Sequence, residues 1–261
     1  SRTLTITDNG IGMTKEELEK NLGTIARSGS LDFKTENQSD NIDIIGQFGV
    51  GFYSAFMVAK KVTVISRAQG ADTAWKWEST GVEGYTLTES DKEDVGTEII
   101  LVLKDDTDTD KYSEYLEDYE LANLVKKYSD YIRFPIRMEM THSRRKEGSP
   151  DDKPEFEDVR EWETVNSMVP LWQRKKSDVK REEYDKFYQE RFGDMTPPQS
   201  VVTVSAEGAV TYQALLFIPS QAPGLYYTED YEPGLQLYSS GVMIMDKCAD
   251  LLPDYLSFVR G

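Results

Sequence analysis

The feature that most constrains this chain is an acid followed by two glycines at the end of its first predicted strand. In "LTITDNGIGM", Leu4 and Ile6 alternate with threonines, which predicts a strand with one buried face. The strand runs into Asp8, and Gly10 and Gly12 follow at alternate positions. Taken alone, this sequence is also typical of an ordinary turn before a helix.

Two further glycine elements stand in the first hundred residues. Glycines recur through residues 46–51, directly before an apolar helix expected to start near Phe52. Gly96 and Thr97 open the apolar run "GTEIILVL". Each element by itself is compatible with a tight turn or a hairpin end, since short glycine patterns occur often by chance.

Together the three elements predict a nucleotide site. A buried carboxylate at Asp8 accepts a hydrogen bond from an exocyclic amine such as adenine N6, while Gly10 and Gly12 let the flat base lie against backbone. The glycines of residues 46–51 turn N–H groups inward at a helix N-terminus, where phosphate is favoured. The Thr97 hydroxyl is then available to the base, directly or through water.

The glycines of residues 46–51 also match the dinucleotide-binding fingerprint, and the context argues against that interpretation. The fingerprint belongs between the first strand and helix of a parallel βαβ unit. Here a polar loop precedes the glycines and antiparallel strands are expected after them.

Hydrophobic periodicity predicts the elements of the first part of the chain. Thr14 and Glu17 form a capping-box pattern that begins a helix, which we expect to end at Gly29. Four alternating runs follow between residues 61 and 103, and they predict an antiparallel meander: "KVTVISRA", "AWKWES", "GYTLTES" and "GTEIILVL".

The composition changes after residue 140. Residues 141–158 hold no apolar run and are dense in charge, which predicts a linker between domains at 1–140 and 159–261. The second domain is expected to hold a charged helix that ends before Gly193 and four strands. The segment "CADLLPDYLSFVRG" predicts the start of a further helix.

Charge and residue counts exclude several classes of function. With 47 acidic and 30 basic side chains, the formal charge of −17 disfavours nucleic acid and anionic membranes as partners. Cys248 and His142 are the single cysteine and histidine, which argues against zinc sites and Ser-His-Asp catalysis. We interpret His142 as a solvated loop residue. The one cysteine fits a reducing compartment, so we expect a cytoplasmic protein.

Several motifs resemble one superfamily, the GHKL ATPases, which includes gyrase, histidine kinases, MutL-type repair proteins and the ninety-kilodalton heat-shock chaperones. They are "DNGIGM", "NLGTIARSGS", "GQFGVGFYSAFMVA" and "GTEIILVL". The chain is most similar to the bacterial branch of the chaperones, and "WETVNSMVPLW" and "ALLFIPSQAP" resemble their middle domain. The resemblance implies an α+β fold: a two-layer α/β sandwich of the GHKL (Bergerat) type with a mostly antiparallel sheet, then the start of an α/β middle domain.

The resemblance also implies the residues of an ATP or ADP pocket. Asp8 would accept the adenine amine with Gly12 and Met13 against the base, Thr97 would assist through water, and Asn21 would face the ribose or phosphate. Two further groups would complete the pocket: a mobile lid that begins at Arg27, Ser28 and Gly29, and a phosphate loop of Gln47, Phe48, Gly49, Val50, Gly51 and Phe52.

The implied function is that of an ATP-dependent molecular chaperone, a homodimer that binds partly folded client proteins and hydrolyses ATP with Mg²⁺. Two alternatives remain: a GHKL ATPase of the topoisomerase or mismatch-repair type, and a nucleotide-binding module without hydrolysis. The family's water-activating glutamate and magnesium-binding asparagine precede the aspartate motif, and its arginine for the γ-phosphate follows the position of Gly261. We therefore assign no catalytic or metal-binding residue and expect this chain to hydrolyse ATP poorly by itself.

Overall fold

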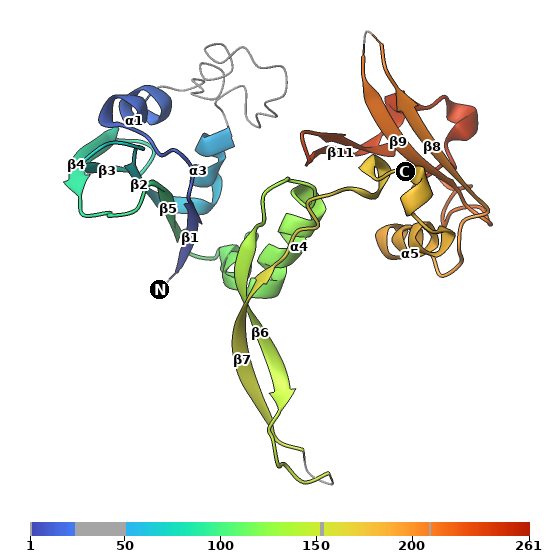
Figure 1. The fold of residues 1–261 in the computed structure, drawn as a ribbon, viewed down its shortest axis with the longest axis horizontal. Coiled ribbons are helices and arrows are strands. Elements are labelled where there is room, and N and C mark those ends of the chain that lie inside the picture. The colour runs from blue at the N-terminus through green and yellow to red at the C-terminus, as the bar shows by residue number, and fades with distance from the viewer. Residues whose placement is uncertain (1, 24–50, 152–153, 209) are drawn as a thin grey trace. The chain divides into compact units, whose positions relative to one another are not determined.

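The computed structural model describes residues 2–23, 51–151, 154–208 and 210–261, and the chain divides into two compact units at residues 1–121 and 122–261. The first unit contains these elements (Figure 1): β1 (Thr3–Asp8), α1 (Lys15–Leu22), the 3-10 helix η1 (Gly51–Ser54), α3 (Ala55–Val58), β2 (Ala59–Arg67), β3 (Ala74–Ser79), β4 (Tyr85–Ser90), β5 (Gly96–Leu103) and η2 (Tyr112–Leu116). The boundary between the units falls within α4 (Asp118–Tyr128).

The first unit is built on one five-stranded sheet in the order β1-β5-β2-β3-β4, with antiparallel neighbours throughout. The predicted meander is correct for β2, β3 and β4 and wrong for β5. That strand pairs with β2 and β1 instead of extending the sheet beyond β4. Alternating apolar residues specify that a segment is a strand, and they carry no information about its neighbours.

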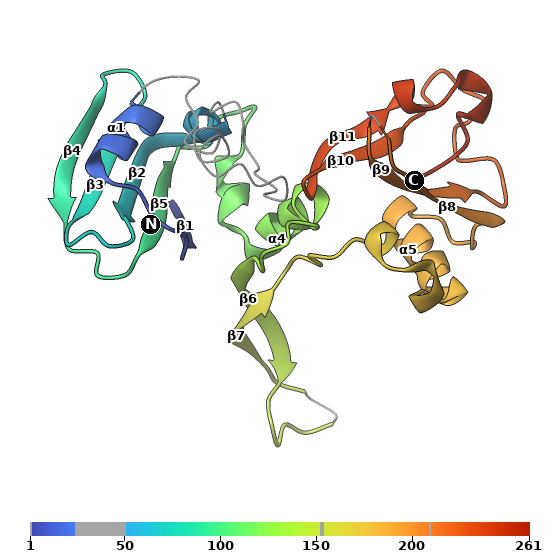
Figure 2. The same ribbon diagram turned by 45° about the horizontal axis from the view of Figure 1, so that its top comes forward.

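A helical layer covers one face of this sheet, as Figure 2 shows for α1. The predicted capping box is confirmed, because Thr14 N donates to Glu17 Oε2 at 2.7 Å and Glu17 N donates to Thr14 Oγ1 at 3.2 Å. Leu18 and Leu22 of α1 are buried against Val62, Val64 and other sheet residues. The predicted two-layer α+β fold with a mostly antiparallel sheet is confirmed.

Two expectations for the ends of this region differ from the structure. α1 ends at Leu22, and the predicted continuation to Gly29 lies outside the described residues. β1 does not bury one complete face, since Ile6 is 52% exposed and only Leu4 packs on the core. Within the described residues β1 is an edge strand that pairs only with β5, so fewer elements surround it.

The second unit contains the remaining elements: β6 (Arg137–Arg145), β7 (Phe156–Thr164), η3 (Leu171–Gln173), η4 (Lys176–Asp178), α5 (Arg181–Phe192), β8 (Ser200–Ala206), β9 (Tyr212–Ile218), β10 (Leu235–Ser239), β11 (Val242–Cys248), η5 (Ala249–Leu251) and η6 (Asp254–Leu256). The strands form three separate antiparallel pairs, β6–β7, β8–β9 and β10–β11. No helix of the described residues is long and apolar enough to span a membrane.

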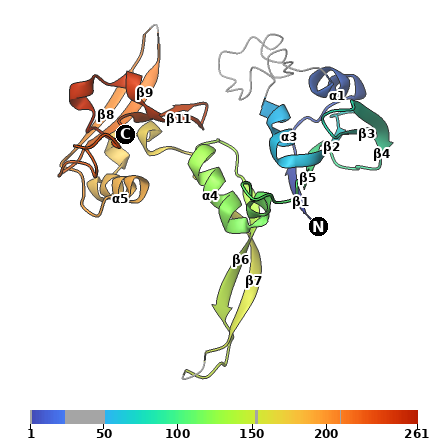
Figure 3. The same ribbon diagram turned by 180° about the vertical axis from the view of Figure 1, so that it is seen from behind.

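The segment 141–158 is not a structureless linker. β6 and β7 form a long hairpin that includes residues 141–145 and 156–158 (Figure 3). His142 accordingly lies on β6 rather than in a loop, opposite Val159, and its Nε2 is hydrogen-bonded to Glu163. The positions of the domain boundaries at 140 and 159 stay a prediction.

The charged helix of the second unit is confirmed as α5, which ends at Phe192, and Gly193 follows in the left-handed conformation with φ of 65°. The expected start of an α-helix after Cys248 is wrong, because the segment forms two three-residue 3-10 helices, η5 and η6. Pro253 interrupts the segment, and Arg260 pairs with Phe217 as an isolated bridge.

Candidate nucleotide site

A row of polar residues crosses three neighbouring strands at one end of the first unit's sheet. Asp8 of β1 lies opposite Thr97 of β5, and Thr97 lies opposite Ser66 of β2. Opposed residues of antiparallel strands share a face. The two preceding rows on this face are apolar: Ile6, Ile99 and Val64, then Leu4, Leu101 and Val62. The core face therefore ends in a polar edge that includes two of the predicted site residues.

The Asp8 carboxylate is held in place by backbone amides. Its Oδ1 accepts hydrogen bonds from Gly10 N at 2.9 Å and from Thr97 N at 3.3 Å. Its Oδ2 has no hydrogen-bond partner among the described residues. The side chain is exposed, so the expectation of a buried carboxylate is wrong. Asp8 is the last residue of an edge strand, and the described elements do not cover it.

Ser66, which is not among the predicted site residues, connects the row to the loop after β1. It is fully buried, and its Oγ accepts from Met13 N at 2.8 Å, lies 3.3 Å from Gly96 O and lies 3.0 Å from Thr97 Oγ1. A carbonyl only accepts, so the single Ser66 proton goes to Gly96 O and the Thr97 hydroxyl donates to Ser66. Thr97 Oγ1 then retains acceptor capacity for a water or an amine.

The polar position of Ser66 could have been found from the sequence. In "KVTVISRA", Val62, Val64 and Ser66 occupy alternate positions, so Ser66 falls on the face that the valines bury. A serine at such a position requires hydrogen-bond partners, which marks it as part of a polar cluster.

Gly12 is required by the packing of its loop against β2. It has φ of +67°, and a Cβ at this position would lie 1.9 Å from the carbonyl oxygen of Arg67. On either side, Gln69 N donates to Ile11 O at 2.8 Å and Met13 N donates to Ser66. The glycine was predicted to give space to a flat base. The structure adds a second reason for a glycine here: the backbone of this loop lies directly against the backbone of β2 at Arg67.

Asn21 presents a buried polar atom without a protein partner. It lies on α1, one residue before the helix ends, and its Oδ1 is buried with no hydrogen bond among the described residues. Buried side-chain amide oxygens are normally satisfied, so this atom is suited to a ligand or a water. The next carbonyl, Leu22 O, accepts from the Tyr53 hydroxyl at 3.0 Å, which joins the end of α1 to η1.

The described part of the predicted phosphate loop consists of Gly51 and Phe52. Gly51 begins η1, and a Cβ added there would meet no atom within 4 Å. The Phe52 side chain packs into the core with its ring 5.6 Å from the Trp77 ring in an edge-to-face contact. Of Phe52, only the backbone is therefore suited to a phosphate. Seven predicted site residues lie outside the described residues: Arg27, Ser28, Gly29, Gln47, Phe48, Gly49 and Val50.

Comparison with known families agrees with this geometry and defines the class. Residues 1–109 match the family described as histidine kinase-, DNA gyrase B- and HSP90-like ATPase. The first unit is a GHKL-type ATPase domain. Residues 146–261 match a second family, described as Hsp90 protein. By these two matches the chain is similar to members of the Hsp90 family.

Curated bacterial relatives match the chain along its whole length. It is 57% identical over 261 residues to the chaperone protein HtpG of Alkaliphilus oremlandii and 57% identical over 262 residues to that of Bacillus subtilis. It is 58% identical over 261 residues to the chaperone protein HtpG of Halalkalibacterium halodurans. Each match covers 100% of this chain and 41% of the relative, so the chain spans about two fifths of their length.

Proposed function

We propose that the first unit binds ADP and ATP, with Asp8 as the acceptor for the adenine amine. The observation that carries the proposal is the state of its carboxylate: Oδ1 is fixed by Gly10 N and Thr97 N, and Oδ2 of this exposed side chain has no hydrogen-bond partner among the described residues. A carboxylate fixed in this way is pre-organised to accept from a ligand, and it cannot donate while ionised. An exocyclic amine is therefore the complementary group.

Other predicted site residues support a purine nucleotide rather than a free amine. Thr97 Oγ1 retains acceptor capacity beside Asp8, and the loop of Gly12 and Met13 is anchored to β2 next to it. Asn21 Oδ1 is available for a hydroxyl of the ribose or for a phosphate-bound water. Mg²⁺ would accompany the phosphates of ATP, where it neutralises their charge. None of the described residues is assigned to hold it.

The whole protein, we propose, is an ATP-dependent molecular chaperone of the cytoplasm. Nucleotide binding would close a lid that starts at Arg27, and the change would reach client proteins through the second unit of a homodimer. The similarity to bacterial HtpG chaperones supports this proposal. No general base is assigned among the described residues, so we propose that the 261-residue chain binds nucleotide and hydrolyses ATP slowly.

Calorimetry with a matched pair of ligands tests the nucleotide proposal. ADP is compared with purine riboside diphosphate, in which hydrogen replaces the exocyclic amine. Loss of a hydrogen bond to a charged group costs about 1.5–3 kcal/mol, so the analogue should bind roughly tenfold or more weakly. Equal affinity for the two ligands, or no saturable ADP binding, would contradict the proposal.

A further inference from the structure

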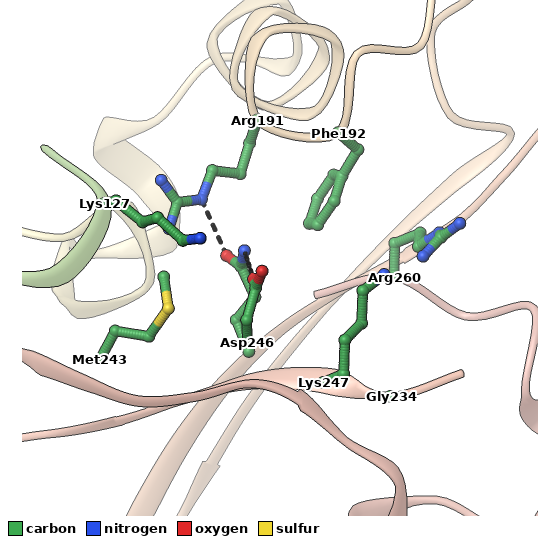
Figure 4. A pocket seen from close by; sticks show the side chains of 9 residues that line it. Lys127, Arg191, Phe192, Gly234, Met243, Asp246, Lys247 and Arg260 are labelled. Atoms are coloured by element: carbon green, nitrogen blue, oxygen red, sulfur yellow. Dashed lines mark hydrogen bonds between the residues drawn. The ribbon is translucent and has the colours of Figure 1, made fainter. Parts of the chain in front are cut away.

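A cavity of about 350 Å³ opens in the second unit beside α5 and the β10–β11 hairpin (Figure 4). Four of the side chains that line it are cationic: Lys127, Arg191, Lys247 and Arg260. Asp246 is the only carboxylate among the described residues that line it. Such a concentration of positive charge is unexpected in a chain whose formal charge is −17. None of these residues belongs to the candidate nucleotide site.

None of these cations is neutralised by a close ion pair with a described residue, although Asp246 and Glu232 act on Lys247, and Asp194 on Arg260, at longer range. Among the described residues, none of the four forms an ion pair with a carboxylate within 4.0 Å. In Figure 4 the Lys127 side chain points into the cavity toward Arg191, and Lys247 extends toward Arg260. Burial and the nearby Arg260 guanidinium lower the pKa of Lys247. An anion in the cavity would favour the charged form of Lys247 and so oppose both effects.

The lining holds Arg191 in a fixed orientation through neutral partners. Arg191 Nε donates to Gln236 Oε1 at 2.8 Å, and its Nη2 donates to the Tyr238 hydroxyl. Gln236 Nε2 donates in turn to Asp246 Oδ1 at 2.7 Å. The glutamine thus separates the cation from the one carboxylate, and the positive charge of Arg191 stays available. The Arg260 guanidinium is oriented separately, 5.5 Å from the centre of the Tyr231 ring.

We propose that this cavity binds a phosphate group, either as inorganic phosphate or as the phosphate of a small phosphomonoester. Four cations against one carboxylate favour an anion with two charges over a single carboxylate. Arginine forms directional, paired hydrogen bonds with phosphate oxygens, and lysine adds a compact charge. Ligand cavities in proteins begin at about 300 Å³, so the volume suits a phosphate with a small organic group.

Titrations followed by ¹⁵N-edited NMR test the proposal on the 261-residue chain. Inorganic phosphate and glucose 6-phosphate are the two probes, and the amide signals of Gly234 and Lys247 report on the cavity. Saturable shifts at these amides are expected. Tighter binding of inorganic phosphate identifies the free anion, and tighter binding of glucose 6-phosphate identifies a phosphomonoester. Shifts that do not saturate for either probe would overturn the proposal.

Three charge variants make the test specific. Lys247→Gln removes a cation from the lining and should weaken binding about three- to fivefold, as for a partly exposed ion pair. Asp246→Asn keeps the oxygen that accepts from Gln236, removes the negative charge and should tighten binding by a similar factor. Lys176→Gln, an equal charge change at an exposed position outside the lining, should leave affinity unchanged. If Lys247→Gln and Asp246→Asn both bound phosphate with the affinity of the unchanged chain, the proposal would be overturned.

Discussion

Thr97 Oγ1 lies 3.0 Å from Ser66 Oγ, at the point where the apolar core face of the first sheet becomes polar. The contact links the strand that carries Thr97 to the strand that supports the loop of Gly12 and Met13. It also sets the direction in which the Thr97 hydroxyl donates. The two buried hydroxyls therefore form the inner side of the candidate nucleotide site, with the exposed Asp8 beside them.

Ser66→Ala should reduce the stability of the first unit and weaken nucleotide binding. The change leaves Met13 N without its acceptor and Thr97 without the group to which it donates. An unsatisfied buried donor costs about 1–3 kcal/mol, so the free energy of unfolding in urea should fall by that amount. Ser90→Ala is the control, because Ser90 lies on β4 and its side chain forms no hydrogen bond among the described residues. Equal stability of the two variants would count against the proposed role of Ser66.

Gly12→Ala should be among the most disruptive small substitutions in the chain. A left-handed residue with a Cβ costs about 1–2 kcal/mol, and here the Cβ would also meet Arg67 O at 1.9 Å. Forced movement of the backbone adds about 1–3 kcal/mol. Gly70→Ala measures the cost of the left-handed conformation alone, since Gly70 has φ of +80° and open space around it. Thermal unfolding should show the larger loss for Gly12→Ala, and similar losses would mean that the loop moves away from β2 easily.

Glu78 should give the first unit a stability contribution that depends on pH. Hydrogen bonding to Lys61 is the main cause that lowers its pKa to about 2 from the usual 4.5, with Thr63 and Lys76 adding to the effect. Because the folded state holds the lower pKa, the contribution is complete above pH 4.5 and is lost as the pH falls toward 2.

Urea unfolding of Glu78→Gln at several pH values measures this contribution. The variant should be less stable than the unchanged chain at pH 6, and the difference should shrink steadily below about pH 4.5. Glu89→Gln serves as the control, because Glu89 is exposed on β4 and forms no ion pair among the described residues. A difference that is independent of pH would show that Glu78 acts through packing rather than charge.

Local sequence patterns predicted most strands and helices correctly and failed where distant segments determine the structure. The charged segment 141–158 lacks apolar alternation because the β6–β7 hairpin forms cross-strand ion pairs instead of burying a face. Arg144 Nη2 lies 2.6 Å from Glu161 Oε2, and Lys146 Nζ lies 3.4 Å from Glu155 Oε2. Pairs of this kind depend on register, which composition does not reveal.

The candidate site was predictable in its residue types and less so in its environment. Asp8, Gly12 and Thr97 were recognised from their motifs, and the structure places Asp8 next to Thr97. Asp8 is exposed at the end of β1, which the pairing of β5 with both β1 and β2 leaves at the edge of the described sheet. Ser66 was missed because its importance comes from three contacts with residues of other segments.

The most direct test of the central claim is calorimetry of ADP with Asp8→Asn, with Asp72→Asn as the matched control. In Asp8, one oxygen accepts from two backbone amides and the other is offered to the ligand. Asparagine has a single acceptor oxygen, so at least one of these hydrogen bonds must be lost in either orientation of the amide. Asp72 is exposed and forms no hydrogen bond among the described residues. We predict that Asp8→Asn binds ADP about tenfold or more weakly and no longer distinguishes ADP from purine riboside diphosphate, while Asp72→Asn keeps both properties. Unchanged ADP affinity in Asp8→Asn would contradict the assignment of Asp8 to the adenine amine.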